Sequence, residues 1–188
     1  PFALVGATTR AGLISAPLRD RFVVRVHLDY YTVDELAKII FRSAGKLEMP
    51  MDDETATEIA GRSRGTPRLA NNRLRWVRDY STSRANRVVD LDIARTALEM
   101  QGIDELGLDG FDRRYLETLQ RVFGGGPAGI EAIAHTMSTA VDTLEDDVEP
   151  FLLRYELIIR TPRGRRLTER GEAHLGDAPR PGPQQKLF

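Results

Sequence analysis

The residues in this sequence with the clearest chemical potential are a pair of threonines and two arginines near its beginning. The stretch GATTRAGLISAPLRDRF, residues 6–22, places Thr9 ahead of Arg19 and Arg21. Hydroxyl and guanidinium groups bind phosphate oxygens well. No glycine-rich phosphate loop accompanies them, so we interpret these residues as parts of a site whose other half lies outside the sequence.

A glycine run, FGGGPAG, is the first alternative source of a phosphate site. A P-loop requires GxxxxGK[ST], because its lysine reaches the phosphates and its hydroxyl holds the metal ion. The segment GGGPAGIEA supplies neither residue. The run is therefore predicted to end one helix and start the next.

A second cluster of arginines surrounds the sequence RTPRGRR near the end of the chain. Gly164 would let a backbone approach closely, and arginine suits phosphate contacts geometrically. A solvated surface is the alternative, but nucleic-acid contact is favoured. Such contacts carry no base information, so binding should be weakly sequence-specific and sensitive to salt. The predicted DNA-binding residues are Arg160, Arg163, Arg165 and Arg166.

The remaining charged residues favour structural roles over metal binding. His27, His135 and His174 are far apart and share no motif, so they are interpreted as structural or surface residues. An acidic group on one helix could hold a metal or form a carboxylate pair, but a solvated face is favoured. This helix should stay out of a major groove, since its charge repels phosphate. The group is Asp142, Glu145, Asp146, Asp147 and Glu149.

Six arginines fall within GRSRGTPRLANNRLRWVRD, and most are interpreted as a solvated or DNA-facing surface. Arg68 differs, because it follows Pro67 in the first turn of a predicted helix. A guanidinium there could meet an anion at the helix start, although spacing alone favours an ordinary surface residue. The six are Arg62, Arg64, Arg68, Arg73, Arg75 and Arg78.

Composition limits the class of protein. The chain has 188 residues, a formal net charge of -1 and no cysteine, which excludes disulfides and thiolate metal sites. No apolar run approaches the roughly 20 residues of a membrane span, so we expect a soluble intracellular protein. The opening PFALVGATT has the pattern of a buried strand and indicates a portion of a longer chain.

Periodicity predicts the elements that must position these residues. Residues 22–28 alternate as in a half-buried strand. Thr32 and Glu35 form a capping-box pattern at the start of a helix over residues 33–43. Further helices are predicted over residues 53–61, from Pro67 to about residue 79, and after a cap at Asp90. The run GIDELGLDG is predicted to be a linker.

Beyond that linker the pattern predicts a winged helix. A helix over residues 111–123 precedes two shorter helices that meet near Ser138, as in a helix-turn-helix. The sequence ELIIRTPRGRRLTERG then predicts a hairpin, the wing. The last residues, 177–188, are rich in proline and glutamine and are predicted to be disordered.

Seven ordered motifs resemble the RuvB family of AAA+ ATPases, the bacterial motors of Holliday-junction branch migration. They are GATTRAG, SAPLRDRF, RSRGTPR, DELGLD, FGGGPAG, EPFL and RTPRGR, and the resemblance covers residues 1–176. It implies a mainly α fold with the end of an AAA+ α/β core in residues 1–31. An AAA+ helical lid would follow in residues 32–103, and a winged-helix DNA-binding domain in residues 104–176.

The resemblance also implies roles for the opening residues. Thr9 would be the sensor-1 residue, Arg21 an arginine finger that reaches a neighbouring subunit's ATP, and Arg68 the sensor-2 arginine. ATP and Mg²⁺ would be bound mainly by an upstream domain, so this portion alone should not hydrolyse ATP. Arg19 could equally be a surface residue.

The partners implied are duplex DNA or a Holliday junction, a homo-hexameric ring, a RuvA-like junction-binding protein and a RuvC-like resolvase. The setting would be cytoplasmic recombination, DNA repair and the SOS response. The alternative hypothesis is a stand-alone winged-helix regulator or adaptor, which leaves GATTR and LRDRF unexplained.

Three positions depart from the family pattern, at Val23, Trp76 and Glu156. Glu156 stands where a glycine is expected to close a helix, and a positive φ there would cost a non-glycine residue about 1 kcal/mol.

Overall fold

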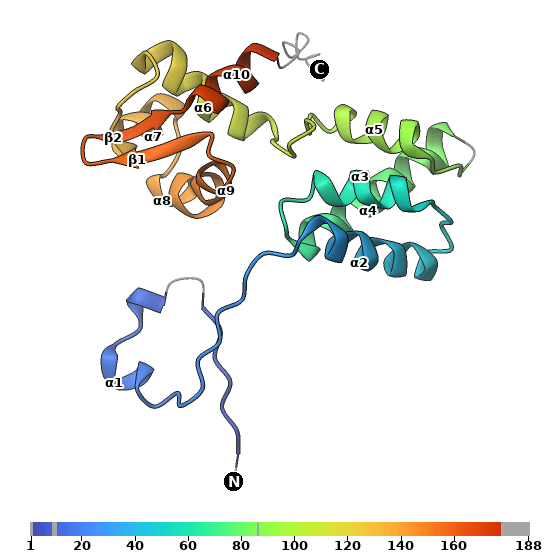
Figure 1. The fold of residues 1–188 in the computed structure, drawn as a ribbon, viewed down its shortest axis with the longest axis horizontal. Helices are drawn as coiled ribbons and strands as arrows, with labels where there is room; N and C mark the ends of the chain where they lie inside the picture. The colour runs from blue at the N-terminus through green and yellow to red at the C-terminus, as the bar shows by residue number, and fades with distance from the viewer. Residues whose placement is uncertain (1, 9–10, 86, 178–188) are drawn as a thin grey trace.

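The computed structural model describes residues 2–8, 11–85 and 87–177 of the chain. Figure 1 shows an extended N-terminal segment, a unit of four helices, and a second unit that contains a β-hairpin. The two units have separate hydrophobic cores. None of the described helices is both long and apolar enough to cross a membrane.

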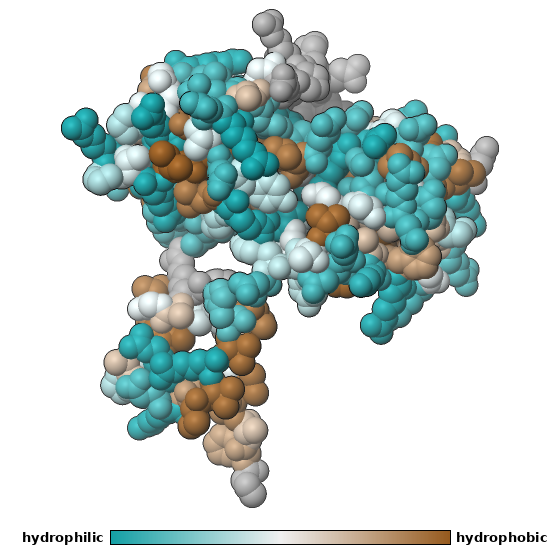
Figure 2. Space-filling view, viewed as in Figure 1, coloured by the Kyte–Doolittle hydropathy of each residue, from teal (hydrophilic) through white to brown (hydrophobic). Residues whose placement is uncertain are grey.

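The N-terminal segment contains a short 3-10 helix, η1 (Ala11–Leu13), and one helical turn, α1 (Ala16–Arg19). The buried strand expected over residues 2–5 and the half-buried strand expected over residues 22–28 are both wrong for this structure. Phe2, Val23 and Leu28 are 91%, 95% and 85% exposed. A strand needs a neighbour to pair its backbone and cover its apolar face, and in the described residues only the hairpin forms a sheet. Figure 2 shows apolar residues on the surface of this segment.

The first helical unit comprises α2 (Val33–Lys46), α3 (Asp53–Gly61), α4 (Pro67–Arg84) and α5 (Leu91–Met100). The predicted capping box is confirmed, since Thr32 Oγ1 accepts from the Glu35 amide and the Glu35 carboxylate accepts from the Thr32 amide. The Asp90 cap is confirmed by its hydrogen bond from the amide of Ile93. Local cap chemistry therefore fixes where α2 and α5 begin.

The core of this unit is formed by apolar residues that recur at helical spacing on all four helices. Its fully buried members include Leu36, Ile40, Ile59, Leu74 and Leu98. Helix α4 runs five residues beyond the predicted end at residue 79, because the sequence there contains no glycine or proline to stop it.

The second unit begins with α6 (Gly110–Phe123) and continues with α7 (Ile130–Met137), α8 (Val141–Thr143), a π-helical turn η2 (Leu144–Val148) and α9 (Glu149–Arg154). Ser138, at φ 53°, ends α7 in the left-handed region and turns the chain toward α8. The predicted helix-turn-helix is therefore confirmed.

The wing is an antiparallel hairpin of β1 (Ile158–Thr161) and β2 (Gly164–Leu167), with Thr161 opposite Gly164. The glycine run stops α6, as predicted, with Gly124 in the left-handed region. It also packs on the wing, since a Cβ on Gly126 would lie 2.4 Å from the Arg165 carbonyl oxygen. A final helix, α10 (Glu169–Asp177), was not predicted, and residues 178–188 lie outside the described part.

Candidate functional site

Arg21 lies just after α1, on the exposed N-terminal segment. Its amide donates to the Leu18 carbonyl at 3.2 Å, which continues the helical turn by one residue. Its side chain is exposed, and within the described residues its guanidinium makes no ion pair. Arg19 is exposed as well. The structure thus leaves both guanidinium groups available to a partner. Thr9 lies outside the described residues.

Arg68 occupies the first turn of α4, and its side chain is exposed. Pro67 is the first residue of the helix, and Thr66 makes no side-chain capping bond to the following amides. Because Thr66 does not cap them, the amides at this helix start can direct their partial positive charge toward an anion. Arg68 and the helix start could therefore meet the same anion.

The prediction that most arginines of residues 61–79 form a surface is wrong for Arg62 and Arg73. Arg62 and Arg73 are 3% and 5% exposed. Arg62 donates to the Ile103 carbonyl at 3.1 Å, and Arg73 donates to the Gly107 carbonyl at 3.2 Å. Burial, with the charge of Arg64 close by, lowers the pKa of Arg73 to about 10. These arginines are structural, and they hold the segment predicted as a linker against the first helical unit.

The second unit also contacts the segment predicted as a linker. Arg113 donates to the Gly102 carbonyl at 2.7 Å and lies 3.4 Å from Asp104. His174, on α10, approaches the same aspartate at 2.9 Å. Burial opposes ionisation of Asp104, but hydrogen bonds from His174 and the Leu108 amide hold its pKa below its ordinary value. The predicted linker, residues 102–110, is therefore fixed against both units, and we call it the joint.

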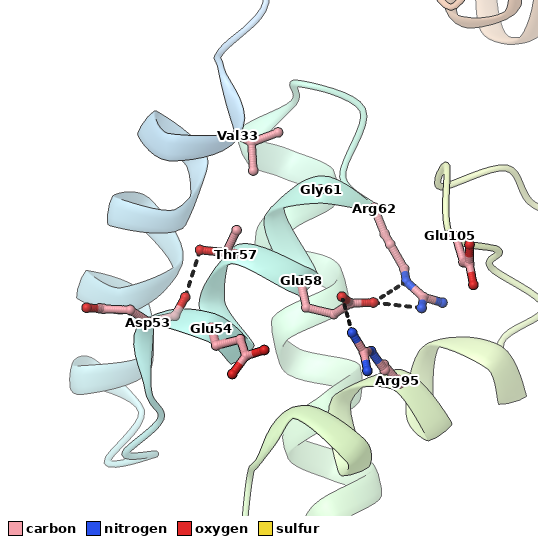
Figure 3. Close-up of a pocket in the computed structure, with 9 residues that line it drawn as sticks. All are labelled: Val33, Asp53, Glu54, Thr57, Glu58, Gly61, Arg62, Arg95 and Glu105. Carbon is pink, nitrogen blue, oxygen red and sulfur yellow. Dashed lines mark hydrogen bonds and ion pairs between the residues drawn. The ribbon is translucent and has the colours of Figure 1, made fainter.

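A cavity of about 450 Å³ lies between α3, α5 and the joint, and Figure 3 shows the residues that line it. Glu58, in its wall, accepts from Arg62 at 2.8 Å and from Arg95 at 3.4 Å (Figure 3). Both of these arginines are thus engaged with a carboxylate rather than aimed at a ligand. The described residues contain no group of histidine or acidic side chains that could hold a metal ion.

The four arginines predicted to bind DNA divide into two pairs. Arg163 and Arg166 are exposed on the wing, and within the described residues their guanidinium groups make no ion pair. Arg160 and Arg165 instead turn back toward α9, where both bind Glu149. Arg165 also donates to Glu145 at 2.8 Å. The structure therefore brings two of the predicted residues to a carboxylate and leaves two free.

Glu149 corrects the interpretation of the acidic group as wholly solvated. Its side chain is fully buried, and it accepts from Tyr115 at 2.7 Å in addition to the two arginines. Burial alone would raise the pKa of Glu149, but the hydrogen bonds from Arg165, Tyr115 and Arg160 hold it below its ordinary value. A sequence signal existed, since Glu149 precedes the buried Leu152 by three residues and so shares its helix face.

The unit of four helices and the winged helix correspond to the lid and C-terminal domains of an AAA+ protein. Three family models match in order: the RuvB P-loop domain over residues 1–28, the RuvB AAA lid domain over residues 31–104 and the RuvB C-terminal winged helix domain over residues 105–176. The chain belongs to the RuvB family.

Two similar proteins agree with this assignment. The chain is 59% identical over 175 residues to the branch migration complex subunit RuvB of Rhodopirellula baltica, covering 93% of this chain and 48% of the relative. It is 51% identical over 181 residues to the Streptomyces avermitilis subunit, covering 96% of this chain and 51% of the relative. The chain thus spans about half the length of these relatives.

A solved structure shares the fold as well as the sequence. The RuvB Holliday junction branch migration motor of Thermotoga maritima superposes with a TM-score of 0.89 at 45% identity. The match covers 95% of this chain and 60% of that structure.

Proposed function

We propose that this chain is the C-terminal portion of an ATP-dependent DNA motor that drives branch migration of Holliday junctions in recombination and repair. One observation carries the proposal. Arg21 and Arg68, for which the family resemblance implies contact with nucleotide phosphates, both expose their side chains, whereas Arg62 and Arg73 are buried in structural contacts.

The proposed domains are the end of an AAA+ ATPase core in residues 1–31, a lid in residues 32–103 and a winged helix in residues 104–176. Arg21 acts as an arginine finger on the nucleotide of a neighbouring subunit, and Arg68 acts as sensor 2 on its own subunit's nucleotide. Thr9 is proposed as sensor 1. A guanidinium placed in advance stabilises the charge that develops on phosphate oxygens during transfer.

The residues fit ATP better than they fit a metal ion. Two exposed guanidinium groups, one of them at an uncapped helix start, match phosphate oxygens. ATP supplies the phosphoryl group whose transfer drives movement. The described residues offer no acidic cluster for Mg²⁺, so we assign no residue of this portion to the metal ion.

DNA contact is proposed for the wing, through Arg163 and Arg166. Arg160 and Arg165 support that contact by fixing the hairpin on α9. Exposed acidic side chains on the preceding helical segment, Asp146 and Asp147, would repel phosphate and favour contact by the wing instead of that helix.

The finer assignments follow the family resemblance. We propose a homo-hexameric ring, duplex DNA at a junction as substrate, and RuvA-like and RuvC-like proteins as partners. The proposed setting is the cytoplasm, with a role in the SOS response.

Replacing Arg21 by alanine in the full-length protein tests the motor proposal. Loss of a finger supplied by a neighbouring subunit should lower the ATPase rate by about 10³-fold or more. Duplex DNA affinity should hardly change, because Arg21 lies in a different segment from the wing. Arg19→Ala is the matched control, since it removes an exposed arginine two residues away.

Mixing variant and native subunits extends this test. If each finger acts on a neighbour's site and the sites of a ring are coupled, activity should fall more steeply than the fraction of variant subunits. Full turnover by the Arg21→Ala protein would contradict the finger assignment. Absence of ATP hydrolysis by the native full-length protein would favour the alternative of a winged-helix DNA-binding adaptor.

A further inference from the structure

Arg154, the last residue of α9, reaches out of its own unit. Its Nη2 donates to the main-chain carbonyl of Arg64 at 2.7 Å, across 90 residues of sequence. The guanidinium carbon lies 3.8 Å above the ring of Tyr30. Arg154 thus contacts the first helical unit and the end of the N-terminal segment together.

Arg64 is held at both its main chain and its side chain. Its φ of 56° lies in the left-handed region, which is costly for an arginine and persists only where contacts determine it. The side chain donates to the Gly107 carbonyl at 2.7 Å, forms an ion pair with Asp112, and lies 4.6 Å over the ring of Phe151. The winged-helix unit and the joint therefore fix the shape of the turn at Arg64.

Gly65 brings the N-terminal segment to the same turn. Its carbonyl accepts from the Tyr31 amide at 3.0 Å. A Cβ at Gly65 would lie 2.8 Å from the Cβ of Tyr30 and 3.2 Å from Nη1 of Arg154. Any larger residue would push these groups apart. Three parts of the chain thus meet at residues 64–65.

This turn leads directly into the helix that carries Arg68. The Thr66 amide donates to the Ser63 carbonyl at 3.0 Å, and Pro67 then begins α4. Ser63 is itself buried, and its hydroxyl donates to the Ile59 carbonyl at 2.6 Å. The start of α4, and with it the position of Arg68, is therefore set by a short, hydrogen-bonded turn.

We infer that Arg154 is a positioning residue that couples the DNA-binding winged helix to Arg68. This inference rests on the proposed function. A shift of α9 on DNA binding would move the Arg64 carbonyl and the Tyr30 ring together, because one planar guanidinium holds both. Lysine can keep the charge and one hydrogen bond, but it lacks the planar group that stacks on a ring while donating sideways.

The test compares Arg154→Ala and Arg154→Lys with native full-length protein. The main measurement is the ratio of ATPase rates with and without saturating duplex DNA. For Arg154→Ala this ratio should fall at least about five-fold, the low end of typical coupling between two sites. The DNA dissociation constant should stay within about two-fold of native, since Arg154 does not belong to the wing. Arg154→Lys should recover part of the ratio.

Arg121→Ala is the matched control, because Arg121 is an exposed arginine of the same unit whose ion pair with Glu117 stays on its own helix. Its ratio should equal the native one. Hydrogen exchange of the amides within residues 62–68, all except Pro67, provides a second measurement. It should accelerate in Arg154→Ala and not in Arg121→Ala.

The outcomes separate the inference from the proposed function. A native ratio in Arg154→Ala, or unchanged exchange at residues 62–68, overturns the coupling role. A loss of thermal stability with an unchanged ratio would show a purely structural arginine and also overturns it. Native protein without ATP hydrolysis refutes the proposed function instead, and the exchange measurement then decides alone whether Arg154 holds the turn.

Discussion

Replacing Glu149 by glutamine tests whether a buried carboxylate holds the wing in place. The carboxylate is fully buried, with Arg165 Nε and Tyr115 Oη at 2.8 and 2.7 Å from Oε1. Glutamine keeps the size and one acceptor but removes the charge. Arg165, only 15% exposed, would then be left beside a neutral group.

The size of the stability loss depends on which partners Arg160 and Arg165 keep once the charge of Glu149 is removed. Breaking a buried ion pair by removing one partner costs about 3–5 kcal/mol. The low end applies here, because the Arg160 side chain is 50% exposed and can regain water. Arg165 also keeps its ion pair with Glu145 at 2.8 Å. We expect Glu149→Gln to lower the free energy of unfolding of the winged-helix unit by about 3 kcal/mol.

Urea unfolding followed by two probes measures this loss. Helical circular dichroism reports both units, whereas fluorescence of Trp76, the only tryptophan, reports the first unit. The dichroism transition of the second unit should move while the Trp76 transition changes less. Glu145→Gln is the matched control, because Glu145 is 39% exposed and its ion pair should contribute no more than about 1 kcal/mol.

The stability difference between native and Glu149→Gln protein should depend on pH in a defined direction. The pKa of Glu149 is lower in the folded state than its ordinary value of 4.5. Its stabilising contribution is therefore complete above pH 4.5 and is lost as the pH falls through the folded-state pKa. The difference between native and Glu149→Gln protein should be largest near neutral pH and shrink in acid. A loss no greater than that of Glu145→Gln, or one independent of pH, would refute the reasoning.

Three further predictions concern the wing, a helix end and the joint. Alanine at both Arg163 and Arg166 should weaken duplex binding. It should also reduce the slope of log K against log salt by about 0.9 for each phosphate that is no longer neutralised. An unchanged slope in a salt titration would exclude both residues from the interface. Glu156→Gly should stabilise the protein by about 1 kcal/mol, because Glu156 is exposed at φ 55°; a lower melting temperature would contradict this. Gly107→Ala should destabilise by more than about 1 kcal/mol, since its Cβ would lie 2.5 Å from the Arg62 carbonyl oxygen at a φ of 87°; native stability in urea would show that the joint can relax.

Local signals in the sequence predicted much of the fold. Cap residues at Thr32 and Asp90 marked helix starts, because a cap acts on amides only three residues away. Pro67 began a helix as expected, since its missing amide costs nothing in the first turn. Glu156 adopts the positive φ expected of the glycine position it occupies. These features depend on neighbours in sequence, which a single chain displays directly.

Features that depend on distant partners escaped prediction. The alternation over residues 22–28 has the pattern of a strand, but no described strand is present beside it to complete a sheet. Arg62 and Arg73 are charged residues of the type usually found on a surface, yet the carbonyl groups that they bind lie 41 and 34 residues away in the joint. The prediction of an acidic surface at Glu149 failed for the same reason. Charge alone does not reveal which ionic groups will find a buried counterpart.

Two groups of arginines in this chain differ in burial and in partners, and the difference has a mechanical consequence. Arg64, Arg73 and Arg165 are largely buried and bind carbonyls or carboxylates, so each fixes one segment against another. Arg21 and Arg68 are exposed and unengaged with any described carboxylate. Breaking the contacts of a buried, paired guanidinium costs several kcal/mol. The buried arginines should therefore keep their contacts when one segment moves, so that the attached segment moves with it. Movement of the winged helix should therefore reach Arg68 as a change of position, through the turn at Arg64 that leads into α4.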